Sequence, residues 1–459
     1  MLSFKDAFEI VSPVQMSRID ELCGIAEATL IENAGLAVAK EIARRYGAVK
    51  TVVLRGPGKN GKDGVAAARY LSAWGWQVEV SHEIGDAELI IDALYGAGLN
   101  RNFSIVLADA INNAGVPVVA IDVPSGLDGQ SGRPRGGCVK ADLTITFFRK
   151  KPAHVLFPGR ALCGEIVVLD IGISSAVLEK IGQKLWENSK LKLPAFPPSG
   201  HKFNRGHAVV LSGGKFKTGA SRLAAQAALR IGAGLVTLVG GADALTVHAN
   251  HVTAIMLAEI ADAAALGELL TDQRKNVICI GPASGMGETT RQNVNVALAS
   301  AAAVVLDADA LTTCSENAAE LFGWIKNRAN ASVVMTPHEG EFEKLFGNLI
   351  NKSDSKVERA RTAAYLSGAT IILKGPDTVI AHPSGRAVVN TNAPPSLATA
   401  GSGDVLAGIV TGLLAQGMQA FEAACAAVWV HGEAANAFSS RSFTAEDLVQ
   451  QIAISVEQS

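Results

Sequence analysis

The chain has 459 residues, a formal net charge of −2 and a pI near 6.5. This charge balance excludes a general electrostatic attraction to nucleic acid or to an anionic membrane, so any anion-binding site must be local. The length exceeds what one ordinary hydrophobic core supports, and it predicts two or three domains.

The cysteines and the N-terminus indicate the compartment. The six cysteines show neither a C-x-x-C pair nor the spacing of a zinc site, which predicts reduced thiols. Lys5, Asp6 and Glu9 interrupt the apolar core that a signal peptide needs. Later apolar runs are broken, for example by Arg230 and Asp307, before they reach membrane-spanning length. We therefore expect a soluble cytoplasmic protein with no membrane or nucleic-acid partner.

The first part of the chain alternates helical stretches with short apolar strands. We predict a helix over residues 17–46, followed by strands at 51–55, 88–92, 117–122, 143–148 and 165–169. Continuous apolar runs between helices are typical of a buried parallel sheet with helices on both faces. The predicted fold class is therefore α/β, here a Rossmann-like doubly wound domain that binds ligands beyond the carboxyl ends of its strands.

Glycine-rich loops with polar side chains follow three of these strands. After the first strand comes G-P-G-K-N-G-K-D-G, residues 56–64, whose backbone amides are suited to cradling phosphates. Asp92 and Asp122 end two further strands and open the second and third loops. Each loop alone also fits a tight corner or an Asx turn. Their common position at one sheet edge instead favours a shared pocket.

These loops carry a resemblance to a known family. G-P-G-K-N-G-K-D-G, D-A-L-Y-G-A-G-L-N-R and D-V-P-S-G-L-D-G, preceded by L-I-E-N-A-G, resemble the NAD(P)H-hydrate epimerase domain of bifunctional nicotinamide-nucleotide repair proteins. The resemblance covers about residues 10–185. It implies that this domain interconverts the R and S epimers of NADH or NADPH hydrated at C6, known as NADHX and NADPHX.

The resemblance also implies a set of site residues. Positions linked to a potassium ion are Asn60, Asp92 and Ser125. Substrate-contacting positions are Lys59, Asn60, Gly61, Lys62, Asp63, Gly96, Ala97, Gly98, Leu99, Asn100, Arg101, Asn102 and Asp122. Because inversion at C6 needs acid–base help, either for loss and return of an oxygen or for ring opening, we expect Asp122 to handle the proton. Lys140 is a second candidate, although a solvated lysine before a strand explains it equally well.

One loop departs from the family pattern. The family has N-N-G-G-D-G where this chain has K-N-G-K-D-G, so two cations, Lys59 and Lys62, are introduced. Three hypotheses follow. A lysine pairs with the substrate diphosphate, an ammonium group weakens potassium binding nearby, or the domain has lost turnover and only binds.

A proline-rich segment separates the two halves of the chain. L-K-L-P-A-F-P-P-S-G, residues 191–200, has the composition of an extended connector. We predict an N-terminal domain over residues 1–190, a linker over 191–199 and a larger α/β domain over 200–459. Strands of the second domain are expected at 208–212, 235–239, 277–281, 303–307, 332–336 and 370–374.

The segment A-T-A-G-S-G-D-V-L-A-G-I, residues 398–409, places Asp404 between a glycine turn and an apolar helix. One explanation is that Ser402 or Asp404 caps the helix. The other is that the turn binds a phosphate while Asp404 takes a proton from an attacking hydroxyl group. The segment alone leaves both open.

Further motifs of the second part resemble a second family. H-K-F-N-R-G-H-A-V-V-L-S-G-G, G-A-G-L-V-T-L, L-D-A-D-A-L, T-P-H-E-G-E-F, L-K-G-P-D-T-V-I-A and A-T-A-G-S-G-D-V-L-A-G-I are similar to the ribokinase-like ADP/ATP-dependent NAD(P)H-hydrate dehydratases. Six ordered motifs span nearly all of residues 200–440, and the order of the domains matches the fused repair enzymes. G-P-A-S-G at 281–285 departs from the family's G-P-G-L-G.

The second resemblance implies a reaction and its residues. Asp404 would deprotonate the C6 hydroxyl group as it attacks the terminal phosphate of ADP, giving AMP, phosphate and NAD(P)H, with Mg²⁺ shielding the phosphates. Hydrate-contacting positions are Ala220, Gly285, His338 and Asp404. Nucleotide-contacting positions are Lys374, Gly375, Pro376, Asp377, Thr378 and Gly403. The resemblance also favours a homo-oligomer. Competing hypotheses are a ribokinase-type small-molecule kinase and a nucleotide-sensing scaffold.

Overall fold

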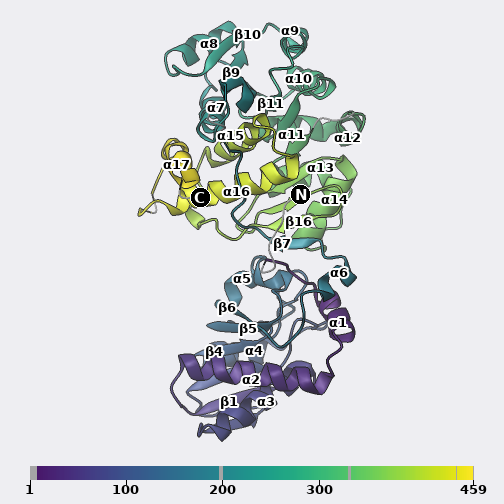
Figure 1. The fold of residues 1–459 in the computed structure, drawn as a ribbon, viewed down its shortest axis with the longest axis vertical. Helices are drawn as coiled ribbons and strands as arrows, with labels where there is room; N and C mark the ends of the chain where they lie inside the picture. Colours follow the sequence, from purple (N-terminus) through teal and green to yellow (C-terminus); the bar gives the residue numbers. More distant parts are fainter. Residues whose placement is uncertain (1–7, 196–199, 329–331, 441, 458–459) are drawn as a thin grey trace. The chain divides into compact units, whose positions relative to one another are not determined.

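The computed structural model describes residues 8–195, 200–328, 332–440 and 442–457. The chain divides into two compact units, with the division between Glu187 and Asn188 (Figure 1). Residues 196–199 of the predicted linker lie outside the described residues. The domain boundaries drawn from the sequence stay a prediction.

The first unit is built around a parallel sheet. Its strands run in the order β2-β1-β3-β4-β5-β6, and every pair is parallel. The elements in chain order are α1 (Pro13–Leu22), α2 (Glu27–Arg45), β1 (Thr51–Arg55), α3 (Lys59–Ala73), β2 (Val78–Ser81), β3 (Leu89–Ala93), α4 (Ile105–Asn112), β4 (Val118–Ile121), β5 (Leu143–Phe147), η1 (Pro152–His154), α5 (Gly159–Leu162), β6 (Glu165–Leu169), α6 (Val177–Ile181) and β7 (Leu185–Glu187).

The predicted continuous helix over 17–46 is wrong. It is two helices, because α1 ends at Leu22 and Gly24 adopts a left-handed conformation with φ of 75°. Ser12 caps α1 through a capping box with Gln15, so this helix also begins earlier than expected. The break redirects the chain and lets α1 and α2 both line the cavity described below.

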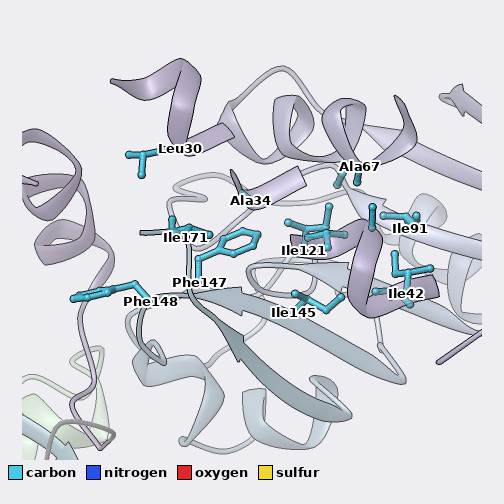
Figure 2. Packing of buried hydrophobic residues seen from close by; sticks show 14 of the residues in the cluster. Leu30, Ala34, Ile42, Ala67, Ile91, Ile121, Ile145, Phe147, Phe148 and Ile171 are labelled. Carbon is cyan, nitrogen blue, oxygen red and sulfur yellow. The ribbon is translucent and has the colours of Figure 1, made fainter. Parts of the chain in front are cut away.

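The core of the first unit lies between the sheet and the helices α2 and α3. Ile91, Ile121 and Ile145 project from neighbouring strands toward Ile42 and Ala67 on these helices (Figure 2). The two helices approach closely at Gly35, where an added Cβ would lie 2.3 Å from the Cβ of Ala66. This packing holds the start of α3, and therefore the first glycine-rich loop, against the sheet edge.

The second unit contains a larger sheet with the strand order β10-β9-β8-β11-β12-β13-β14-β15-β16. Pairs from β10 to β14 are parallel, whereas β15 and β16 add an antiparallel hairpin. The strands are β8 (His207–Leu211), β9 (Leu235–Gly240), β10 (Met256–Glu259), β11 (Val277–Ile280), β12 (Ala303–Leu306), β13 (Val333–Met335), β14 (Thr370–Leu373), β15 (Val379–Ala381) and β16 (Ala387–Val389).

Helices of the second unit cover this sheet (Figure 1). They are η2 (Lys202–Arg205), α7 (Gly219–Arg230), α8 (Ala242–Ala249), α9 (Ala263–Leu269), α10 (Glu288–Ala299), α11 (Ala308–Cys314), η3 (Ser315–Asn317), α12 (Ala318–Lys326), α13 (Glu339–Phe346), α14 (Lys356–Ser367), η4 (Pro395–Leu397), α15 (Ser402–Ala415), α16 (Ala420–Asn436) and α17 (Ala445–Glu457). Helix α15 packs on α7 and α16, which explains why the residues from Val405 to Ala415 are all buried.

The α/β prediction is confirmed for both units, and each predicted strand has an observed counterpart. Strands β2, β7, β10, β15 and β16 are additional. Within the described residues no single helix has the length and apolar composition to cross a membrane. The helices α1 and α2 reach that length and composition only when they are taken together, and this pair is bent by 118°.

Candidate active sites

The first unit holds a cavity of about 440 Å³ at the carboxyl edge of its sheet. Most of the predicted substrate contacts line it: Lys59, Asn60, Asp63, Gly96, Ala97, Gly98, Leu99, Asn100, Arg101 and Asp122. Gly61, Lys62 and Asn102 are not among its lining residues, and the Lys140 side chain is exposed outside it. The shared pocket predicted from the three loops is therefore present.

Asp122 is anchored at the floor of this cavity. Its Oδ2 accepts a hydrogen bond from the backbone amide of Ala97 at 2.8 Å, and Oδ1 accepts one from Thr146 Oγ1 at 3.1 Å. Lys151 Nζ lies 3.0 Å from the same Oδ1. Although burial alone raises the pKa of Asp122, the Lys151 cation and the Ala97 amide outweigh it and hold the pKa below its usual range. The carboxylate is thus anionic and fixed in direction.

Two neighbours of Asp122 escaped the sequence analysis. Lys151 is only 2% exposed and also donates to Thr146 Oγ1 and to the Phe147 carbonyl oxygen. His154 accepts from the Lys151 amide through Nδ1 at 2.9 Å, so its Nε2 carries the hydrogen donated to the Asp122 carbonyl oxygen. Burial lowers the pKa of His154 to about 4, which keeps the ring neutral. These contacts fix the backbone of Asp122, whose φ is 68°.

Asn60 presents an unpaired amide group. Its side chain is buried, and neither Oδ1 nor Nδ2 has a hydrogen-bond partner within the described residues. A Cβ at Gly96 would lie 2.8 Å from Asp122 Oδ2 and 3.5 Å from Asn60 Oδ1. The absence of a side chain at Gly96 therefore leaves room for both groups. A buried amide without a partner costs free energy unless a ligand or ion satisfies it.

Asp92 and Ser125 form a closed pair behind the loop at Leu94 to Ala97. Asp92 is completely buried and accepts from the Ser125 amide at 2.8 Å and from Ser125 Oγ at 2.6 Å. Burial raises the pKa of Asp92 despite these hydrogen bonds. No ion pair to this carboxylate exists in the part of the chain that the structure describes. The carboxylate oxygens of Asp92 and the unpaired Oδ1 of Asn60 are oxygen ligands of the kind that bind a monovalent cation.

The two lysines that replace family residues are held by acidic side chains. Lys59 Nζ lies 3.0 Å from Asp20 and 3.7 Å from Glu27, while Lys62 Nζ lies 2.9 Å from Glu27. Both lysine side chains stay more than half exposed. The pairs tie the start of α3 to α1 and α2 at the cavity rim.

In the second unit, Asp404 lies in the first turn of α15. The N-cap residue is Gly401, with φ of 84°, and no side chain caps this helix. The capping explanation for Ser402 or Asp404 is therefore wrong. Burial raises the pKa of Asp404 to about 6, Asp307 adds to the rise, and Lys374 opposes it. The carboxyl group is free to serve as a base near neutral pH.

Lys374 links the end of β14 to this helix start. Its Nζ lies 2.8 Å from Asp307 Oδ1 and 4.0 Å from Glu341 Oε2, and a Cβ at Gly403 would lie 3.4 Å from it. Burial lowers the pKa of Lys374, but Asp307 and Glu341 outweigh it and raise the value overall. In the sequence, Asp307 stood out only as a break in an apolar run and as part of the motif L-D-A-D-A-L, and Glu341 was not singled out.

The predicted nucleotide loop after β14 is internally braced. Asp377 is buried and accepts from Lys356 Nζ at 2.6 Å. Thr378 Oγ1 donates to the Gly375 carbonyl oxygen at 2.8 Å. The Gly375 amide also donates to Thr378 Oγ1 at 3.2 Å, and the Lys374 carbonyl oxygen accepts from Lys356 Nζ at 3.3 Å. Pro376 has no amide hydrogen, so these contacts fix the shape of the loop between Lys374 and Thr378.

The predicted hydrate contacts, Asp404 of α15 among them, come from four separate segments of the chain. Ala220 lies in the first turn of α7, and the Gly285 amide donates to Asp309 Oδ2 at 2.8 Å. His338 caps α13 and accepts a hydrogen bond from the Gly340 amide through Nδ1 at 2.9 Å. Ala283 adopts a φ of 54°, in the left-handed region that favours glycine.

Comparisons with known proteins decide the family. A family model for NAD(P)H-hydrate dehydratase matches residues 208–456, and one for the YjeF-related protein N-terminus matches residues 27–85 and 79–153. The chain is 33% identical to a bifunctional NAD(P)H-hydrate repair enzyme Nnr of Thermofilum pendens, over 90% of this chain and 88% of that protein. The chain belongs to the bifunctional NAD(P)H-hydrate repair enzymes. A Moorella thermoacetica member of this family is 32% identical over 96% of this chain and 95% of its own length.

A solved structure supports the fold of the second unit. A ribokinase-like superfamily protein from Enterococcus faecalis V583 aligns with a TM-score of 0.51 and 25% identity, covering 58% of this chain and 92% of that one. The ribokinase-like layout predicted for the C-terminal part of this family member is therefore confirmed. The resemblances drawn from the sequence motifs agree with the family on both halves of the chain.

Proposed function

We propose that the two units of this NAD(P)H-hydrate repair enzyme carry two linked steps. The first unit interconverts the R and S forms of NADHX and NADPHX, and the second dehydrates the S form with ADP, releasing AMP, phosphate and NAD(P)H. The observation that carries the second step is the position of Asp404, a half-buried carboxyl group in the first turn of α15 that caps nothing.

The dehydration chemistry follows from this position. Asp404 takes the proton of the C6 hydroxyl group, whose oxygen attacks the terminal phosphorus of ADP while the bond to the AMP oxygen breaks. Backbone amides at the start of α15, with Gly403 among them, stabilise the charge on the transferring group. The C6–O bond then breaks, phosphate leaves, and loss of a C5 proton restores the double bond. Lys374, at the end of β14, supplies a cation for the nucleotide phosphates.

Magnesium fits the second site as a partner of the phosphates. Asp307 and Glu341 place carboxylate oxygens around Lys374, and Mg²⁺ is usually held by one or two carboxylates together with phosphates. In the described residues no group of three or more His, Cys, Asp or Glu side chains forms a closed metal cage. We therefore propose that Asp307 and Glu341 hold Mg²⁺ when nucleotide is bound, where it would neutralise phosphate charge.

We propose a potassium site in the first unit formed by Asn60, Asp92 and Ser125. The unpaired amide oxygen of Asn60 and the buried carboxylate of Asp92 support it, because a cation would satisfy both. The ion would supply positive charge beside an anionic dinucleotide. A potassium titration of epimerisation tests the site, with Asn60→Ala as the variant. We expect strong activation of the parent enzyme and a loss of that activation in the variant, and ion-independent rates would contradict the site.

Product analysis tests the proposed second reaction against a ribokinase-type kinase. The enzyme is incubated with S-NADHX, ADP and Mg²⁺, and the nucleotides are separated by chromatography. We expect AMP, phosphate and NADH in equal amounts. A stable phosphorylated hydrate would support the kinase, and binding without any product would support a sensing scaffold. From the family resemblance and the six free cysteines we further propose a cytoplasmic homo-oligomer, which light scattering of the purified chain tests.

A further inference from the structure

The cavity of the first unit contains a second carboxyl group, that of Asp63. It lies on α3 three residues after Asn60, so both side chains project from the same face of the helix, and both line the cavity together with Asp122. Asp63 is half-buried, and within the described residues it makes no hydrogen bond or ion pair. A carboxyl group of this kind is available to a ligand.

The charged groups around Asp63 leave it without a counter-ion. Those that face it come from four elements or their ends: Asp20 of α1, Glu27 of α2, Lys59 of α3 and Asp122 after β4. Arg101 and Lys151 line the same cavity. Lys59 is engaged by Asp20 and Glu27, and Lys151 is engaged by Asp122.

The environments of the two cavity carboxyl groups are opposite. Burial, with Asp122 and Asp20 adding to it, raises the pKa of Asp63 to about 8, whereas the Lys151 cation holds the pKa of Asp122 below its usual range. At neutral pH one group is therefore protonated and the other is ionised. The surroundings of the two carboxyl groups in this cavity push their pKa values apart. The group with the higher pKa then suits the role of the acid, and the other suits the role of the base.

We propose that Asp63 is the general acid of the epimerase site and that it acts on the C6 oxygen of the hydrate while Asp122 is the base. This inference rests on the epimerase activity proposed above for the first unit. It assigns a catalytic role to a residue that the sequence placed only among the substrate contacts.

Epimerisation at this site proceeds through loss and return of water at C6. The C6–O bond breaks with its electron pair going to oxygen, which takes the proton of Asp63 and leaves as water, while the ring nitrogen lone pair forms a C6–N1 double bond. Water then adds to the other face of C6, its oxygen forming the new C–O bond and its proton passing to Asp122. Exchange of one proton with solvent restores Asp63 to its acid form and Asp122 to its carboxylate. The reverse direction uses the same groups in exchanged roles.

The test is the pH dependence of epimerisation, measured as kcat/KM on the full chain with ADP omitted. The acid must be protonated in the free enzyme, so kcat/KM falls as the pH rises through about 8. Asp63→Asn lowers kcat about 100-fold with KM changed less than threefold, and it removes the alkaline fall. Asp63→Glu, which restores a carboxyl group, recovers part of kcat and the fall.

Matched controls separate the possible outcomes. Asp20→Asn removes another cavity carboxyl group and keeps the alkaline fall, but moves it to lower pH because Asp20 helps to raise the pKa of Asp63. Thermal unfolding of the first unit reports whether each variant is folded. If the parent enzyme does not epimerise at all, the proposed function of the first unit is wrong. If it epimerises without an alkaline fall, or if Asp63→Asn keeps the parent rate and the same fall, the role of Asp63 is wrong.

Discussion

Lys151 Nζ lies 3.0 Å from Oδ1 of Asp122, and the lysine side chain is almost completely buried. Lys151→Met leaves the carboxylate without its cation, so we expect the pKa of Asp122 to rise and epimerisation to fall at least 100-fold. Removal of one partner of a buried pair costs about 3 kcal/mol, which thermal unfolding of the first unit would reveal. Lys150→Met removes the half-buried pair with Glu187 and serves as the control. Equal effects of the two substitutions would contradict the assignment.

The second prediction concerns Asp404. Asp404→Asn lowers dehydration by roughly two to four orders of magnitude, the scale of general-base loss, with nucleotide binding largely retained. Because a base works when it is deprotonated, dehydration by the parent enzyme rises with pH through about 6 and then levels. Initial rates of NADH formation between pH 5 and 8 check both statements. Asp243→Asn, on the exposed first turn of α8, is the control.

Gly96 lies between the side chains of Asn60 and Asp122, so we expect the site to be sensitive to a methyl group added at this position. In Gly96→Ala the new Cβ would lie 2.8 Å from Asp122 Oδ2, so the carboxylate must move. We expect epimerisation to fall tenfold or more, on the scale that a displacement of about 1 Å in a catalytic group produces, while dehydration is unchanged. Gly47→Ala, in the first unit but outside the cavity, has nothing within 4 Å of its new Cβ and keeps the parent rate. A matching loss in both variants would contradict this reasoning.

Ala283 has a φ of 54°, where a side chain is strained. Ala283→Gly relieves this strain, partly offset by the greater flexibility of glycine in the unfolded chain, so we expect a gain of about 0.5 kcal/mol in the free energy of unfolding. Gly285→Ala, at a φ of 84°, should lose about 1 kcal/mol. Urea unfolding of the second unit measures both. A destabilised Ala283→Gly enzyme would show that the methyl group packs favourably.

The sequence predicted the fold well where the pattern was strong. Continuous apolar runs marked β1, β3 and β4, and the loops after them converge on one cavity because parallel strands end at one edge. The break between α1 and α2 was missed because the apolar pattern continues through Gly24. Strands β15 and β16 were missed because each has only three residues and, unlike the equally short β13, neither stands between two helices.

The site was predicted less completely. Lys151 was missed because a lysine after a strand is normally solvated, and only the folded chain brings Asp122, Thr146 and the Phe147 carbonyl oxygen around its ammonium group. Glu341 was missed because its sequence position, one turn after His338, gives no sign that Lys374 from a distant strand lies 4.0 Å away. Contacts between elements far apart in sequence leave no local pattern.

The most direct test of the account follows NADH absorbance with separately prepared R- and S-NADHX, ADP and Mg²⁺. We predict that the parent enzyme recovers NADH from both epimers. Asp122→Asn should still recover NADH from the S epimer but lose the enzyme-dependent recovery from the R epimer. Asp404→Asn should recover NADH from neither epimer. Recovery by Asp404→Asn at the parent rate would contradict the role of this carboxyl group and the mechanism built on it.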